Sequence, residues 1–466
     1  MPEPNQHETQ PGVLTIEEVI YAPAAQMRLE PPHEWLTPDG ELNIIVNQSQ
    51  GGSTVTMRGG DEEIGDPFMD WYGNSASLAG PISNVRKAAE AFRAATENYL
   101  NNINRDDLVT TLKEFAATEH KLLTDYSLKP EHQVEWEKIA LTSELRKLAY
   151  FGFTLYETLF PKGSDLRAIV DKIDYGWRVN ITWLDSDRFW VPHIPWGLLY
   201  RRELPPEGQP VDAEEFWGLR YRIEYKSHPA KGEKKSLGDL KETYRGCCLY
   251  WGDRQEADDV KEARWQQAAW AELANQIFVP SRSEAAKYKE ELKSLLASPA
   301  PTPMRFLYLF CHCDVGDGST PVLRFGSTNK PTDIIEQMDI GQSQLVDRPL
   351  VFVNACMSAG SGAYVANELE QVFFRRGCRA YIGTETKVPI QLASRFAYIF
   401  CQFFYRKMDE KPIAAGEAVY QTRQFLWHQY RNIGGLFYTY INQYELYMAR
   451  EDELEALRRG KGIRHT

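Results

Sequence analysis

Two short runs of residues decide the fold that this sequence predicts: RFLYLFCHCD at residues 305–314 and PLVFVNAC at residues 349–356. Each run is almost entirely apolar and ends in polar or reactive residues. Strands that are apolar on every face are typical of a parallel sheet buried under helices. A third apolar run follows at Ala380–Gly383. Helices are predicted between the runs, at Thr332–Met338 and at Ala363–Arg376 with Gly377 as its C-terminal cap. The order strand, helix, strand, helix, strand predicts an α/β fold with a mostly parallel sheet flanked by helices.

Weaker patterns extend this prediction to the rest of the chain. A period of two at Trp177–Trp183 predicts a half-buried strand, and apolar spacings of three and four from Ile82 to about Phe160 predict a helical hairpin or small bundle. Loop compositions occur at residues 1–13 and 47–53. Further strands are predicted at Leu42–Val46, Tyr221–Tyr225 and Cys247–Trp251, and further helices at Asp258–Ile277, Pro389–Met408 and Pro412–Arg431. An aromatic stripe is predicted to be core: Phe396, Tyr398, Phe400, Phe403 and Phe404.

Composition and charge narrow the class of function. The 466 residues are 43% hydrophobic, 12% aromatic and 25% charged, which is typical of a globular protein. The net charge is −12, and residues 1–70 hold thirteen acids against two arginines. The nearly neutral remainder argues against binding to nucleic acid, because phosphate neutralisation requires clustered Lys and Arg. Seven cysteines without a framework spacing, a polar start and no apolar run of about 18–20 residues predict a cytoplasmic protein with reduced thiols and no membrane association.

The two main runs place a histidine and a cysteine where reactive groups collect. His312 follows the first run and Cys356 ends the second, so both are expected at the carboxyl edge of the parallel sheet. An imidazole near a thiol can take its proton, and the resulting thiolate is a nucleophile. The pair therefore has the residue types that nucleophilic catalysis by cysteine requires.

A zinc site is the competing interpretation of the same residues. It would take Cys311, His312 and Cys313 together with Cys247 or Cys248. Adjacent ligands on an extended strand point to opposite faces, and the sequence has no Cys-x-x-Cys pair, so no metal is expected. The cysteines near the main runs are instead predicted to be structural: Cys311, Cys313, Cys378 and Cys401.

Three stretches of the chain carry a resemblance to one family. Asn354-Ala355-Cys356 matches the Gln-Ala-Cys signature of caspases with Asn in place of Gln, and His312 lies 44 residues upstream, where caspases have about 50. The other stretches are Phe151–Tyr156, which leads to Leu159–Pro161, and Ile194–Leu199. Together they resemble the CHAT-domain peptidases, a branch of the caspase and separase clan of cysteine proteases, over roughly residues 140–445.

The resemblance implies a caspase-like fold and an endopeptidase that hydrolyses peptide bonds in protein substrates without metal or cofactor. His312 would be the general base and acid, and Cys356 the nucleophile. The backbone N–H groups of Cys313 and Cys356 would hold the oxyanion. Two positions depart from the family pattern: Cys313 stands where the family usually has Gly, and Gly197 stands where it has Glu after Pro-Trp.

Four side chains are expected around the substrate pocket. Asn354 lies where clan relatives line the S1 pocket, and by itself it predicts neither an acidic nor a basic P1 residue. Glu385, just after the third apolar run, and Asp314 or Asp317, after His312, would make the pocket negative. These acids favour a basic P1 residue.

The resemblance also divides the chain into four regions. Residues 1–80 are expected to be an acidic, partly ordered leader, 81–300 the helical entry and N-terminal, pseudo-catalytic half, 301–446 the catalytic half, and 447–466 a charged tail. Stand-alone peptidases of this kind resemble effectors of bacterial defence or cell-death systems, so an activating or inhibiting protein partner is expected beside the protein or peptide substrate. If the leader masks the site, its removal should raise the basal cleavage rate.

Two other functions fit the same residues. One is a catalytically inactive, CHAT-like adaptor, which a buried Cys356 would favour. The other is hydrolysis of a small amide, which a closed pocket would favour over a long groove.

Overall fold

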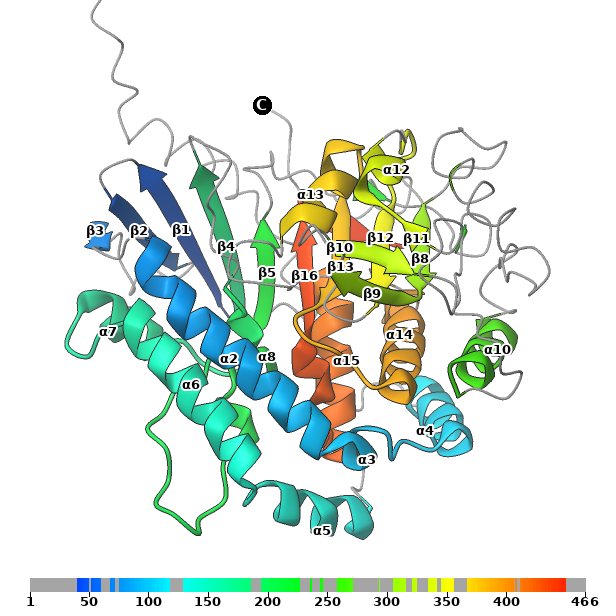
Figure 1. Cartoon of the computed structure of the whole chain (residues 1–466), viewed down its shortest axis with the longest axis horizontal. Helices are drawn as coiled ribbons and strands as arrows, with labels where there is room; N and C mark the ends of the chain where they lie inside the picture. The colour runs from blue at the N-terminus through cyan, green and yellow to red at the C-terminus, as the bar shows by residue number, and fades with distance from the viewer. Residues whose placement is uncertain are drawn as a thin grey trace, which may run out of the picture.

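Ten strands form one continuous sheet among the residues that the computed structural model describes (Figure 1). In spatial order they are β3 (Phe68–Trp71), β2 (Gly52–Gly59), β1 (Glu41–Ser49), β4 (Arg178–Asp185), β5 (Arg222–Lys226), β16 (Tyr438–Asn442), β13 (Ala380–Thr384), β12 (Leu350–Asn354), β8 (Phe306–Phe310) and β7 (Tyr244–Arg245). The described residues are 40–49, 52–59, 68–71, 75–117, 129–185, 194–226, 235–236, 244–245, 258–270, 293, 305–315, 321–324, 334–341, 345–355, 367–405, 407–408 and 411–449.

Eight of the ten strands form two parallel blocks that run in opposite directions, and β2 and β3 extend the sheet beyond β1 as antiparallel strands. β1, β4, β5 and β16 form one parallel block, and β13, β12, β8 and β7 form the other. The blocks meet in an antiparallel pair, in which Tyr381 of β13 lies opposite Ile441 of β16. The predicted α/β class is confirmed, because the three apolar runs are adjacent parallel strands whose residues are all buried. The carboxyl ends of the two blocks therefore lie at opposite edges of the sheet.

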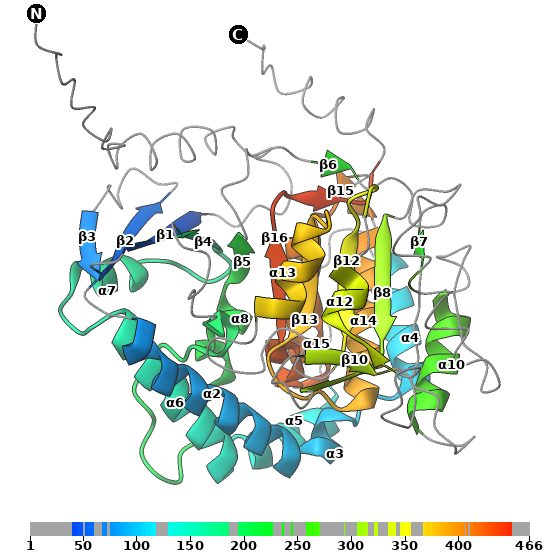
Figure 2. The same cartoon turned by 45° about the horizontal axis from the view of Figure 1, so that its top comes forward.

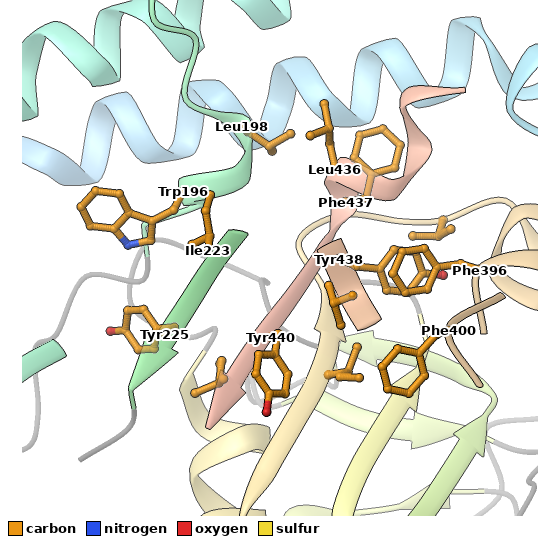
Figure 3. Close-up of a cluster of buried hydrophobic side chains, with 14 of the residues drawn as sticks. Trp196, Leu198, Ile223, Tyr225, Phe396, Phe400, Leu436, Phe437, Tyr438 and Tyr440 are labelled. Carbon is orange, nitrogen blue, oxygen red and sulfur yellow. The ribbon is translucent and has the colours of Figure 1, made fainter. Parts of the chain in front are cut away.

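Helices cover both faces of the second block (Figure 2). α14 (Ile390–Tyr405) and α15 (Ala415–Tyr430) pack together on one face, and α10 (Asp258–Trp270) packs against α14. On that face the rings of Phe396 and Tyr438 stack with centroids 3.5 Å apart (Figure 3). Phe352 meets Phe400 edge to face. α12 (Gln337–Gly341) and α13 (Asn367–Arg375) lie on the other face, where Phe373 contacts Tyr381. The predicted aromatic core is confirmed, with every residue of the stripe buried.

The helical region is confirmed and consists of α2 (Ser75–Ala95), α3 (Glu97–Leu100), α4 (Arg105–Ala117), α5 (Pro130–Ile139), α6 (Ser143–Leu159) and α7 (Asp165–Val170). α2 packs along α6. A Cβ on Gly152 of α6 would lie 2.4 Å from the carbonyl oxygen of Leu198. Gly152 lies in the stretch Phe151–Tyr156 and Leu198 in the stretch Ile194–Leu199, so these two stretches of the family resemblance are packing partners.

Two local predictions are wrong. The helix expected at Thr332–Met338 is replaced by strand β11 (Ile334–Ile335), and helix α12 begins only at Gln337. Two adjacent β-branched residues pair readily with a strand, and β11 pairs with β10 (Pro321–Arg324), which pairs in turn with β9 (His312–Val315). The loop is also shorter than the predicted range 47–53, because β1 and β2 extend into this range from both sides and pair as a hairpin.

The strand at Trp177–Trp183 is confirmed as β4, but it is not half-buried. Its apolar residues Val179 and Ile181 are buried, and so are its polar residues Arg178 and Asn180. The polar face is buried because it meets other polar groups: Arg178 contacts Glu445 at 2.9 Å, and the Asn180 amide donates to the Glu41 carboxylate at 2.8 Å.

Strands β1 to β3 lie within the first 80 residues, so part of the predicted leader belongs to the sheet. The limits of the four predicted regions stay predictions. Several predicted features lie outside the described residues: the strand at 247–251, the end of the helix beyond 270, and the tail from 450. None of the described helices combines the length and apolar character that crossing a membrane requires.

Candidate active site

The carboxyl ends of β8 and β12 form the candidate site. Phe310, the last residue of β8, pairs with Asn354, the last residue of β12. His312 lies two residues after Phe310, at the start of β9, and its side chain is partly exposed. Cys356 lies two residues after Asn354 in the sequence and falls outside the described residues. The two predicted catalytic residues therefore follow paired positions of adjacent strands by the same number of residues.

Asn354 is held in a buried hydrogen-bond network. Its side-chain Nδ2 donates to the Tyr308 hydroxyl at 2.8 Å and to the Ala393 carbonyl at 2.7 Å. Its Oδ1 accepts from the Tyr438 hydroxyl at 2.9 Å. The Tyr308 hydroxyl in turn donates to Gln266 of α10 at 2.7 Å. Both amide hydrogens of Asn354 are thus used, and the network fixes the end of β12 against α10, α14 and β16.

A pocket of about 40 Å³ lies beside this network. Its lining comes from the ends of β8 and β12, from the loop after β13 and from the start of α14: Phe310, Cys311, His312, Asn354, Ala355, Val388, Ile390 and Ala393. Apart from His312 and Asn354, these side chains are apolar or, for Cys311, a buried thiol. The pocket therefore contacts His312, the described member of the candidate dyad.

Glu385 lies at the same edge of the sheet, just after β13, but its charge is compensated. It is 2% exposed, and its carboxylate meets the Arg86 guanidinium of α2 at 3.0 Å. The Thr439 hydroxyl donates to the same carboxylate, and the Glu385 N–H donates to the Phe437 carbonyl at 2.7 Å. Its role in a substrate pocket stays a prediction, as do those of Asp314, whose side chain is not described, and Asp317.

Helix α2 and the residues after α3 rest on the loop that lines the pocket. Besides the ion pair of Arg86 with Glu385, the Thr386 hydroxyl donates to Glu90 of α2 at 2.9 Å. The Leu392 N–H donates to the Asn101 side chain at 3.3 Å. Sequence reasoning missed Arg86 as well as the tyrosines bonded to Asn354. A tyrosine in an apolar run and an arginine on an amphipathic helix carry no signal of a distant polar partner.

The four cysteines predicted to be structural are buried and form no disulfide in the structure. Burial raises the pKa of the Cys378 thiol well above its ordinary value, so this thiol stays protonated. Cys313 lies in β9 opposite Leu323 of β10, and its predicted oxyanion role is untested. Within the described ranges, no three His, Cys, Asp or Glu side chains gather as a metal site would require.

The model of the CHAT domain matches residues 154–433, which is more than half of the chain. This chain belongs to the CHAT-domain family. The matched range includes strands β8, β12 and β13 with the pocket, and it stops before β16.

Solved structures similar to this CHAT-domain chain include two crystal structures of the Saccharomyces cerevisiae separase–securin complex. Their identities are 10% and 9%, with TM-scores of 0.41 and 0.40, and each match covers 93% of this chain. It covers only 32% and 31% of the separase chains, so this chain spans about a third of their length. No curated protein matches the chain.

Proposed function

We propose that this chain is a cysteine endopeptidase in which His312 and Cys356 form the catalytic dyad. The observation that carries the proposal is the pairing of Phe310 with Asn354, each two residues before one member of the dyad. Adjacent strands lie about 4.8 Å apart, and two residues of chain reach at most about 7 Å. An imidazole and a thiol that start from such neighbouring strand ends are within reach of one another.

The chemistry follows from the two side chains. The Cys356 thiol gives its proton to His312, and the sulfur bonds to the scissile carbonyl carbon. His312 then returns the proton to the leaving amine as the C–N bond breaks. Water then attacks the carbonyl carbon of the resulting thioester while His312 takes a proton from it. The C–S bond breaks, the carboxylic product leaves, and His312 returns the proton to the Cys356 sulfur. The backbone N–H groups of Cys313 and Cys356 are assigned to the oxyanion of both steps.

Cleavage profiling of a peptide library by mass spectrometry tests the proposal. Cys356→Ala is expected to abolish cleavage, and His312→Ala to lower it at least about a hundredfold. Cys378→Ala is the matched control, because that thiol is buried and unreactive and is not among the residues that line the pocket. Cleavage that survives in both dyad variants would contradict the proposal. If the wild type cleaves nothing and Cys356 does not react with an electrophile, the chain is an adaptor.

A protein partner is proposed to regulate this site through α2. The contacts of Arg86 with Glu385 and of Glu90 with Thr386 join α2 to the loop that contributes Val388 to the pocket. A partner that moves α2 would therefore move the pocket wall. An effector role in bacterial defence or cell death belongs to the same proposal.

The acidic leader can be tested without breaking the sheet. A chain that begins at residue 40 keeps β1, which pairs with β4 in the first block. If residues 1–39 mask the site, this truncated chain cleaves faster than the full chain. An equal rate removes the masking hypothesis and leaves the dyad proposal intact.

A further inference from the structure

The pocket beside His312 has a chemical character that the sequence did not predict. Acidic residues near the site favour a basic P1 residue, yet none of the described residues that line the pocket is acidic. Glu385, three residues before Val388 of the lining, is buried and meets Arg86 at 3.0 Å. A lysine or arginine side chain in the pocket would lose its hydration without gaining a carboxylate, which is unfavourable.

Asn354 cannot supply the missing recognition of a charged group. Its two amide hydrogens are donated to Tyr308 and Ala393, and its oxygen accepts from Tyr438. The side chain is 2% exposed, so it offers the pocket almost no polar surface that could bind a charged group. Figure 3 shows Tyr438 on β16 turned toward Phe396 of α14, where the ring stack holds the hydroxyl in place for this bond.

The remaining wall is apolar and its size is limited. Phe310, Val388, Ile390 and Ala393 supply hydrocarbon surface. One ordered water needs about 10–15 Å³ of cavity volume, so a pocket of about 40 Å³ has room for about three water molecules. Their share of liquid volume, about 90 Å³, is that of a medium aliphatic side chain.

We infer that this pocket accepts the P1 side chain of the substrate and selects valine, leucine or methionine over charged residues. The inference rests on the proposed function, because the P1 side chain lies next to the carbonyl that Cys356 attacks. Ala355 immediately precedes Cys356 and lines the pocket with His312. A P1 side chain of a substrate at the dyad therefore lies beside this apolar lining.

Three peptidyl acyloxymethyl ketones that differ only at P1, with leucine, arginine or aspartate, test the inference on the full chain. In each, the Cys356 sulfur bonds to the methylene carbon, the C–O bond breaks, the carboxylate leaves and His312 takes the thiol proton. The rate of labelling at Cys356 is measured by mass spectrometry. We expect the leucine probe to react at least about tenfold faster than either charged probe.

A variant that adds a negative charge to the pocket lining gives a second test of the inference. Ile390 is the partly exposed first residue of α14, where an acid is favourable because of the helix dipole. Ile390→Glu is expected to raise the rate with the arginine probe about tenfold and lower it with the leucine probe. Glutamine has nearly the shape of glutamate but no charge, so with Ile390→Gln the arginine probe is expected to react as slowly as with the wild type. Thermal unfolding confirms that both variants are folded.

The outcomes separate this inference from the proposed function. If labelling of Cys356 depends on His312 but the arginine probe reacts as fast as the leucine probe, the inference is overturned and the dyad stands. The same holds if Ile390→Glu changes no P1 preference. If labelling is independent of His312 for all three probes, the dyad fails and the inference fails with it.

Discussion

The two parallel blocks of the sheet differ in the polarity of their buried residues. In the second block, β8, β12 and β13 are buried along their whole length, and the polar bonds gather at the strand ends around Asn354. In the first block, buried charges lie within the strands themselves, on Arg178 of β4 and on Arg222 and Glu224 of β5. The comparison shows that the candidate site lies at the end of the block whose interior is apolar, while the buried charges of the other block pair with one another and hold its strands together.

The buried charged side chains of the first block form ion pairs with one another and with a helix that covers them. The Arg222 guanidinium contacts Glu224 at 2.5 Å and Glu417 of α15 at 3.1 Å. Lys226 contacts Glu224 at 2.8 Å. Burial by itself raises the pKa of Glu224, but the positive charges of Arg222 and Lys226 hold this pKa well below its ordinary value. The carboxylate is therefore ionised at neutral pH and compensates the buried arginines.

Removal of the Glu224 carboxylate is expected to have the largest effect on stability, and it tests the comparison of the two blocks directly. Glu224→Gln removes one of the carboxylates that compensate the buried arginines, leaving Arg222 with Glu417 and Glu445, and is expected to lower the free energy of unfolding by about 3–5 kcal/mol. The control is Glu203→Gln, whose pair with Lys162 is largely exposed and should change stability by less than about 1 kcal/mol. Guanidinium chloride denaturation measures both. Equal losses in the two variants would show that the network is not what stabilises the first block.

The second block is expected to respond less to the loss of its polar centre. Asn354→Ala removes three hydrogen bonds that involve neutral groups and should lower the free energy of unfolding by about 2–3 kcal/mol. Tyr438→Phe keeps the ring stack on Phe396, removes one of those bonds and should cost about 1 kcal/mol. Urea denaturation gives both values. A larger loss for Tyr438→Phe than for Asn354→Ala would contradict the network.

Close packing outside the sheet gives a third, intermediate effect. Gly152→Ala puts a Cβ 2.4 Å from the Leu198 carbonyl oxygen, so α6 must shift, and a cost of about 1–3 kcal/mol is expected. Gly80→Ala lies on the exposed face of α2, with nothing within 4 Å of the new Cβ beyond its chain neighbours. Because Pro81 disfavours a helical residue with a Cβ before it, the gain in helix propensity is offset and a change of less than about 1 kcal/mol is expected. Differential scanning calorimetry compares the two values of Tm. A Tm that Gly152→Ala leaves unchanged would show that α6 tolerates a side chain there.

The smallest expected effect depends on pH and lies outside both blocks. His132 of α5 packs edge to face on Tyr430, and burial lowers its pKa from the ordinary 6.5. Between the lowered and the ordinary pKa, the unfolded chain binds more protons than the folded chain, so stability falls as the pH drops through 6.5. His132→Gln should therefore lose less stability than the wild type between pH 7 and 5, by less than about 1 kcal/mol. Denaturation at both pH values compares the two slopes, and identical slopes would refute the assignment.

Local pattern was sufficient to predict three of the four strands of the second block, all but β7. The runs at 306–310, 350–354 and 380–384 are apolar except for Asn354 and Thr384 at their ends, and such runs form buried strands almost regardless of what surrounds them. The cap at Gly377 is equally local, because its φ of +107° favours glycine. Placing His312 and Cys356 after two of these strands followed from the same patterns.

The first block shows where local pattern fails. The alternation in β4 predicts a strand, but it cannot tell that Glu445, 267 residues after Arg178, buries the polar face. In the same way, the sequence places Asn354 before the cysteine, while only the fold brings Tyr308, Tyr438 and the Ala393 carbonyl to it.

What the sequence alone determined is therefore the order of buried strands and helices and the position of a histidine and a cysteine at strand ends, because hydrophobic periodicity is a property of neighbouring residues. Only the tertiary structure decided that β16 joins two opposed blocks, that Glu385 is neutralised by Arg86, and that the pocket beside His312 is apolar. Each of these depends on which distant residues share a desolvated space, and desolvation sets whether a polar group needs a partner.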